Sequence, residues 1–114
     1  MLEIKRVYDP PSAEDGYRVL VDRLWPRGLK REAAGIDAWL KDVAPSEELR
    51  RWFGHDPARW DTFITRYREE LAAQEPVCQE LARRARKGRV TLLYAAKDPQ
   101  RNNAVVLKSF LTEK

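Results

Sequence analysis

The sequence predicts a single-domain α/β sandwich in which helices flank a small, largely parallel sheet. Two strand-like runs lie near the N-terminus, at 2–8 and 17–24. A continuous apolar run, "RVTLLYAAKD" (89–98), is typical of a strand buried on both faces. Helical patterns fill the middle and the end of the chain. The length of 114 residues is close to the commonest domain size, so we expect one domain over 1–114.

The N-terminal elements are bounded by turn-forming residues. "DPPSAEDG" (9–16) separates the first two strands and predicts a loop. The second strand ends at "WPRG", because Pro26 has no N–H to give to a ladder. In 30–43 the first residues suit a helical turn that Gly35 stops. "IDAWLKDV" then suits either a strand, which we favour, or a second helical piece.

Four helices are expected in the remainder. Ser46 is a suitable N-cap for 45–53, and Asp56 followed by Pro57 suits the start of the next helix. A third helix follows Pro76 and stops at Gly88, and a fourth covers 102–111 with Asn102 or Asn103 as its cap. The apolar residues at helical spacing, expected to face inward, are Trp60, Phe63, Ile64, Tyr67, Leu71, Val77, Leu81, Ala82 and Ala85.

Composition narrows the class of protein. No apolar run is long enough for a membrane span, and the N-terminus lacks a secretory signal, so a cytoplasmic location is expected. The lone Cys78, at a core-like helix position, excludes an internal disulfide and a multi-cysteine metal cluster. The net charge is +4, and fifteen of the 22 basic residues are arginine. This charge permits an acidic partner, either nucleic acid or a phosphorylated metabolite.

Three blocks, "RLWPRG", "WLKDVAPSEELRRWFGHDP" and "VTLLYAAKDPQRNNAVVL", carry a family resemblance. Together they resemble the YeaO-like family, domain of unknown function 488, and the similarity runs from "IKRVYDPP" to the last helix. The resemblance implies a single-domain α/β protein of prokaryotes. It implies no activity and supplies no catalytic residues.

Two polar blocks follow strands of the predicted sheet and suggest an anion site. In open parallel sheets, ligands bind beyond the carboxyl ends of the strands. Parallel strands would bring "DRLWPRGLK" and "KDPQRNN" to one edge, around the free amides of the last helix. The donors expected there are Arg23, Arg27, Lys30, Lys97, Arg101, Asn102 and Asn103. Alternatively, the asparagines and Asp98 only cap and turn the chain, and the arginines pair with Asp22, Asp42 or Asp98.

Three further features bear on function. His55, the only histidine, is a candidate general acid or base, or else a loop residue held by a carbonyl. Trp25 can stack on a base or ring, or close the edge of the core, which we favour. "RRARKGR" (83–89) suits a solvated helix end better than a nucleic-acid patch, since no aromatic residues interleave it.

The sequence therefore suggests three alternative functions. The first is an enzyme for a small phosphorylated or nucleotide-like substrate, with His55 or Asp98 moving protons and Lys97 as charge neutraliser or nucleophile. The second is a nucleotide or nucleic-acid binding module without turnover. The third is a structural protein with scaffold ion pairs. The sequence identifies no cofactor, metal site or oligomeric state.

Overall fold

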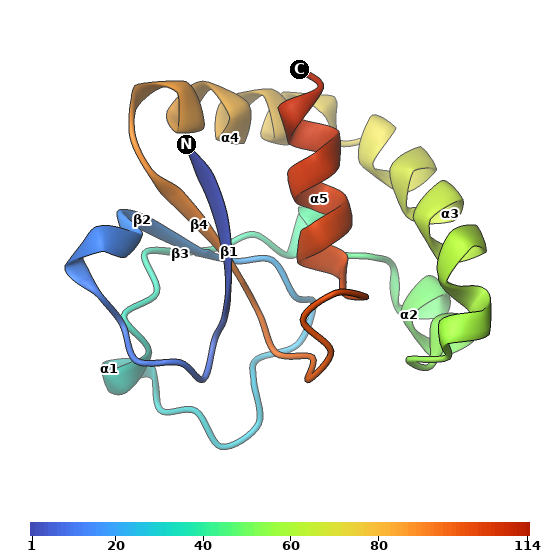
Figure 1. Cartoon of the computed structure of the whole chain (residues 1–114), viewed down its shortest axis with the longest axis horizontal. Coiled ribbons are helices and arrows are strands. Elements are labelled where there is room, and N and C mark those ends of the chain that lie inside the picture. The colour runs from blue at the N-terminus through green and yellow to red at the C-terminus, as the bar shows by residue number, and fades with distance from the viewer.

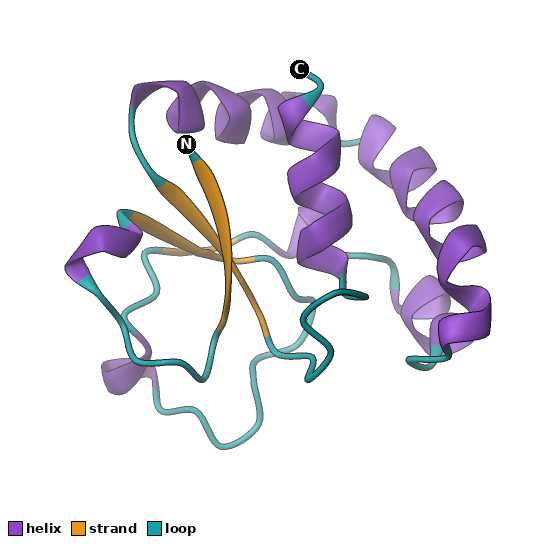
Figure 2. Ribbon diagram, in the orientation of Figure 1, coloured by secondary structure: helices purple, strands orange, loops and turns teal.

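The computed structural model describes all residues 1–114 and contains one four-stranded sheet. Its strands are β1 (Leu2–Arg6), β2 (Tyr17–Leu20), β3 (Ala38–Trp39) and β4 (Val90–Tyr94). Their order across the sheet is β1-β4-β2-β3, and every neighbouring pair is parallel (Figures 1 and 2). The predicted α/β class and parallel sheet are confirmed.

Five helices accompany the sheet: α1 (Arg31–Ala34), α2 (Glu47–Phe53), α3 (Trp60–Ala72), α4 (Glu75–Lys87) and α5 (Asn103–Thr112). Single turns of 3-10 helix lie at 13–15, 41–43 and 57–59. The expected N-caps are confirmed, because in each case a side-chain oxygen of the capping residue accepts a hydrogen bond from a backbone N–H of the first helical turn. Ser46 accepts from the Leu49 N–H, Asp56 from that of Ala58 and Asn102 from that of Val105.

The two faces of the sheet are covered differently. Val19 and Leu92 belong to a core of 19 buried residues shared with α2 to α5. Leu20 and Leu93 point to the opposite face, because side chains alternate along a strand. No long helix covers that second face. Instead, Trp25, Leu29, Ile36 and Trp39, from the segment around the single-turn α1, pack against it.

Several boundaries differ from the sequence prediction. β2 ends at Leu20, although the apolar pattern extended the strand to residue 24. The 9–16 loop contains a 3-10 turn because Ser12 and Asp15 form a reciprocal capping box. In 30–43 both alternatives occur in succession: α1 ends at Gly35 (φ 60°), β3 has two residues, and a helical turn follows at 41–43.

Two further observations concern class and packing. No helix combines the length and the apolar character needed to cross a membrane. Cys78 is a free thiol with no exposed surface, as the sequence predicted, and burial raises its pKa to about 11. Its thiol is therefore a packing group within the core between the helices and the sheet.

Candidate functional site

Parallel pairing of β2 with β4 brings the two polar blocks to one edge of the sheet. Leu20 lies beside Leu93, so the residues that follow each strand emerge together. Between them is a cleft of about 1010 Å³, here called the sheet-edge cleft. It is lined by Arg6, Tyr8, Asp22, Arg23, Leu24, Trp25, Pro26, Arg27, Pro45, Arg50, Phe53, His55, Phe63, Ala95, Ala96, Lys97, Asp98, Arg101, Asn102 and Asn103.

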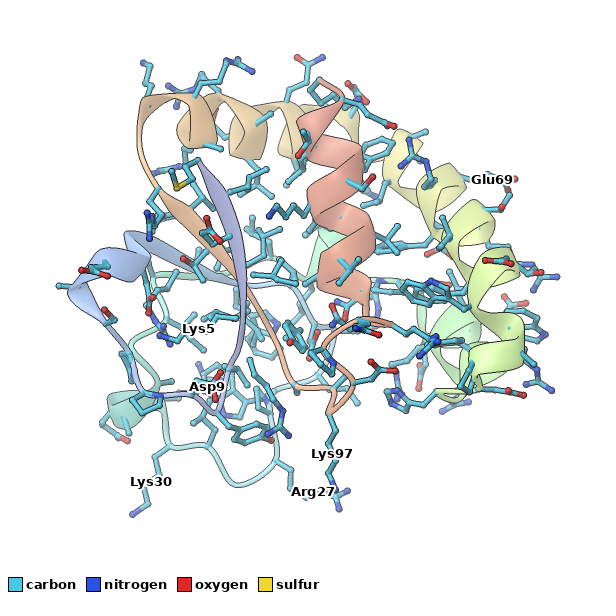
Figure 3. The ribbon with its side chains drawn as sticks, viewed as in Figure 1. Lys5, Asp9, Arg27, Lys30, Glu69 and Lys97 are labelled. Carbon is cyan, nitrogen blue, oxygen red and sulfur yellow. The ribbon has the colours of Figure 1, made fainter.

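Nine of the ten predicted site residues line this cleft. The exception is Lys30, which points outward on the far side of its loop (Figure 3). Arg27 and Lys97, from the two different blocks, lie at the same edge of the molecule in that view. The nine that the fold brings together are Arg23, Trp25, Arg27, His55, Lys97, Asp98, Arg101, Asn102 and Asn103.

The lining of the cleft carries an excess of positive charge. Six arginine and lysine side chains face two carboxylates, those of Asp22 and Asp98. Only Arg101 has a carboxylate partner, Asp98, at 3.6 Å. The other five cations, Arg6, Arg23, Arg27, Arg50 and Lys97, have no carboxylate oxygen within 4.0 Å. With His55 neutral the cleft therefore has a net charge of +4, equal to that of the whole chain.

Backbone carbonyls fix two of these arginines. The Arg6 Nε donates to the Ala96 carbonyl at 3.1 Å. The Arg23 Nε donates to the Pro45 carbonyl at 3.0 Å. A carbonyl orients a guanidinium without neutralising it, so both groups keep their charge and donors for a further partner. The alternative in which Arg23 and Arg27 pair with internal carboxylates is not what the fold contains.

Asp98 and Asn102 build the turn that leads into α5. Asp98 Oδ1 accepts from the backbone N–H groups of Gln100 at 2.9 Å and Arg101 at 3.1 Å, which hold the pKa of Asp98 below its usual value. Asn102 Nδ2 donates back to the Asp98 carbonyl at 2.9 Å. Both residues thus have a local structural role, and their turn directs the N-terminus of α5 at the cleft.

Asp22 is a site residue that the sequence predicted only as a possible partner for an arginine. Its Oδ2 accepts from the Ala95 N–H at 2.9 Å, and its Oδ1 from Asn103 Nδ2 at 3.0 Å. Burial raises the pKa of Asp22 above its usual value, although these hydrogen bonds and the charge of Arg50 oppose the rise. The available signal was its position directly after the apolar run of β2.

His55 lies at the cleft in the loop between α2 and the 57–59 turn. It is exposed and has a φ of 56°, directly after Gly54, which ends α2 with a φ of 52°. Its ring centroid is 6.0 Å from that of Phe53. Two successive residues in the left-handed region turn the chain sharply, and the turn directs the imidazole to the cleft rather than into the core.

Trp25 is held mainly by the protein itself. Its ring packs edge-on against Trp39, with centroids 5.4 Å apart, and its Nε1 donates to the Leu29 carbonyl at 2.7 Å. The guanidinium of Arg31 lies 4.4 Å from its ring centroid. These contacts fit the interpretation of Trp25 as a cover for the second face of the sheet.

The Asp22 pKa leads to a prediction for pH-dependent stability. A carboxyl whose folded pKa is raised binds its proton more tightly in the folded state, so its stabilising contribution is complete below the unfolded value, near 3.8, and is lost as pH rises through the folded pKa. We expect the unfolding free energy of the wild type, measured relative to Asp22→Asn by urea denaturation, to fall over that interval. A difference that stays constant with pH would contradict the prediction.

Comparison with known proteins places the chain in a family. A family model described as the inactive DUF488-N3 subclade, DUF488-N3i, matches residues 1–114. The chain belongs to this family. The expected YeaO-like resemblance is thereby confirmed, since the chain is also 46% identical to the uncharacterized protein YeaO of Escherichia coli over 96% of both chains.

Other relatives of this DUF488-N3i member come from mycobacteria. The uncharacterized proteins Mb3100c of Mycobacterium bovis and Rv3073c of Mycobacterium tuberculosis are each 41% identical to it, over 96% of this chain and 92% of theirs. No solved structure matches the chain. All of these relatives are described as uncharacterized, so they assign no activity or ligand to the family.

Proposed function

We propose that this protein binds a small phosphorylated ligand in the sheet-edge cleft. The observation that carries the proposal is the group of five cations at the cleft that have no carboxylate partner. Cations at a protein surface are commonly offset by neighbouring acids, whereas here six of them share a concave site with two carboxylates. A phosphate group supplies the missing negative charge and accepts several charge-assisted hydrogen bonds at once.

The start of α5 adds to this attraction. Asn102 and Asn103 line the cleft, so the positive end of the ten-residue helix faces the same space as the cations. The apolar side chains of Leu24 and Pro26 provide a wall for the uncharged body of a ligand. A site of this composition suits an organic phosphate ester better than a bare inorganic ion.

Binding without turnover is the version that we propose. The family description calls the subclade inactive. Of the predicted catalytic residues, Asp98 is occupied by its turn, as its two backbone hydrogen bonds indicate. Turnover is the second candidate, favoured by Asp22 and His55 in one cleft. If the wild type releases phosphate from ribose 5-phosphate and His55→Ala does not, the protein is an enzyme and does not merely bind the ester.

A charge-matched pair of double variants tests the proposal. Arg50 and Lys97 line the cleft without a side-chain hydrogen bond or ion pair, so alanine at both removes charge without disturbing the fold. Two lost charge-assisted hydrogen bonds predict an affinity for ribose 5-phosphate about 100-fold weaker by calorimetry. Arg86→Ala with Lys87→Ala, at the exposed end of α4, removes the same charge and should change affinity less than about twofold.

The same experiment separates the outcomes. Equal losses in both double variants would indicate a general charge effect and contradict a site in the cleft. No binding of ribose 5-phosphate or inorganic phosphate to the wild type would remove the proposal.

Nucleic acid is the alternative acidic partner, and a protein in the cytoplasm would meet both nucleic acid and small phosphate esters. The contacts in the structure support nucleic-acid binding less well. Arg83 and Arg84 of the basic 83–89 segment pair with Glu80, and the ring of Trp25 is engaged by Trp39 and Arg31. Affinity for mixed DNA or RNA that exceeds that for ribose 5-phosphate and falls steeply with salt would favour nucleic acid.

A further inference from the structure

We infer that Asp22 makes the cleft selective for phosphate esters of sugars that carry a vicinal diol, with the carboxylate accepting one hydrogen bond from each hydroxyl. This inference rests on the proposed phosphate-binding function and names the class of ligand. It assigns the two chemically different parts of the cleft to the two ends of one molecule. The cations would hold the phosphate, and Asp22 would hold the sugar.

The hydrogen bonds of Asp22 leave it free to accept more. Each carboxylate oxygen accepts one hydrogen bond from the protein, Oδ1 from Asn103 and Oδ2 from Ala95. An ionised carboxylate offers about four lone-pair positions, so each oxygen retains acceptor capacity. Two adjacent oxygens, each with a free position, match two adjacent hydroxyl groups. Asp22 also lines the cleft, so its side chain is at the surface that a ligand in the cleft would contact.

The absence of a cation partner distinguishes Asp22 from a structural carboxylate. Six cations line the same cleft, yet none has a nitrogen within 4.0 Å of the Asp22 oxygens. A half-buried carboxylate without such a partner costs stability, in agreement with the rise that desolvation causes in the pKa of Asp22. By contrast Asp15, the buried carboxylate at the opposite edge of the sheet, binds both Lys5 and Arg18. A carboxylate that lies at a cleft and lowers the stability of the fold is typical of a residue that binds a ligand.

The charge of the cleft decides between two kinds of donor. An ammonium group would suit an isolated carboxylate, but the net charge of +4 in the cleft repels a second cation. A hydroxyl donates a hydrogen bond without adding charge. Asn103 supports the same choice, because its Nδ2 is bound to Val21 and Asp22 and only its carbonyl oxygen is left as an acceptor. That end of the cleft therefore presents acceptors, and the cationic rim presents donors.

The test compares two ligands that differ by one hydroxyl of the diol. Ribose 5-phosphate and 2-deoxyribose 5-phosphate are titrated into the wild-type protein by calorimetry. We expect the ribose ester to bind about tenfold tighter, because a hydrogen bond to a charged group is lost in the deoxy ester. In Asp22→Asn the ratio of affinities should fall to within about twofold of one. Asp42→Asn, the same change at an exposed position outside the cleft, should keep the wild-type ratio.

The outcomes separate this inference from the function on which it rests. Equal affinity of the wild type for both esters overturns the role of Asp22 and leaves phosphate binding intact. A wild-type preference that persists in folded Asp22→Asn also overturns it. Failure of the wild type to bind either ester removes the phosphate-binding function as well. Because the wild-type ratio is informative alone, the test holds even where Asp22→Asn lowers the melting temperature.

Discussion

Replacement of Asp15 with alanine is expected to lower the free energy of unfolding by about 3–5 kcal/mol, as measured by urea denaturation at neutral pH. Asp15 is 8% exposed and Arg18 is 4% exposed, and their side chains form an ion pair that Lys5 extends. The variant leaves the Arg18 guanidinium buried without its carboxylate. Removal of one partner from a buried pair is costly because the remaining charge has lost its compensation.

The Asp15 network also connects elements far apart in the chain. Arg18 donates from Nε to the Gly35 carbonyl at 2.8 Å and from Nη2 to the Ala34 carbonyl at 2.9 Å, so it satisfies the C-terminal end of α1. Burial would raise the pKa of Asp15, but hydrogen bonds from Ser12, Lys5 and Arg18 outweigh it and lower the pKa. Its contribution is therefore present above pH 3.8 and lost as pH falls through the folded pKa.

A surface ion pair provides the control for Asp15. Glu47 and Arg51 pair at 2.7 Å on α2, and both side chains are more than half exposed. Glu47→Ala is expected to cost less than about 1 kcal/mol. Equal effects of Asp15→Ala and Glu47→Ala would contradict the buried role of Asp15.

Substitution of Gly16 by alanine is expected to cost about 4 kcal/mol, from backbone strain and a steric clash together. Gly16 has φ 66° and ψ −131°, a conformation that residues with a side chain avoid. A Cβ there would lie 2.3 Å from the Arg89 carbonyl oxygen, a backbone atom that also accepts from the Tyr17 N–H. The clash would therefore separate the start of β2 from the segment that leads into β4.

Gly28 allows the two causes to be separated. It has a φ of 76°, but a Cβ there meets no atom within 4 Å. Gly28→Ala thus carries strain without a clash and should cost about 1–2 kcal/mol. The two variants are compared by thermal and urea denaturation. A cost at Gly16 no greater than that at Gly28 would show that the Arg89 carbonyl moves aside easily.

The sequence predicted those elements whose signals are local. The helix 47–53 was readable because Ser46 caps it, and β4 because its five residues, all buried, form an uncharged run in which only Thr91 is polar. Eight of the nine predicted site residues in the two polar blocks then line one cleft, as the strand-end rule predicts, since parallel pairing makes neighbouring strands end at the same edge. Lys30 does not line the cleft, because its loop continues past Gly28 before α1 begins.

The remaining features depend on contacts between distant segments. β2 ends at Leu20, although the next residue, Val21, is also buried and apolar. The end of the strand depends on how the following loop packs, and the apolar pattern of the sequence does not specify that packing. Trp25 and Trp39 meet on the second face because β3 pairs with β2, which no periodicity in 30–43 specifies. Arg6 and Arg50, which line the cleft, lie outside both polar blocks and are brought there by β1 and α2.

The strand order has a consequence for synthesis of the chain. β4 is the last strand to leave the ribosome, yet it lies between β1 and β2 and pairs with both. Until residues 90–94 emerge, the nascent chain can pair only β2 with β3, and the N-terminal strand has no neighbour. The four-stranded sheet therefore assembles only after β4 has been made, and a ribosome that stalls before β4 would carry a chain with unpaired strand edges.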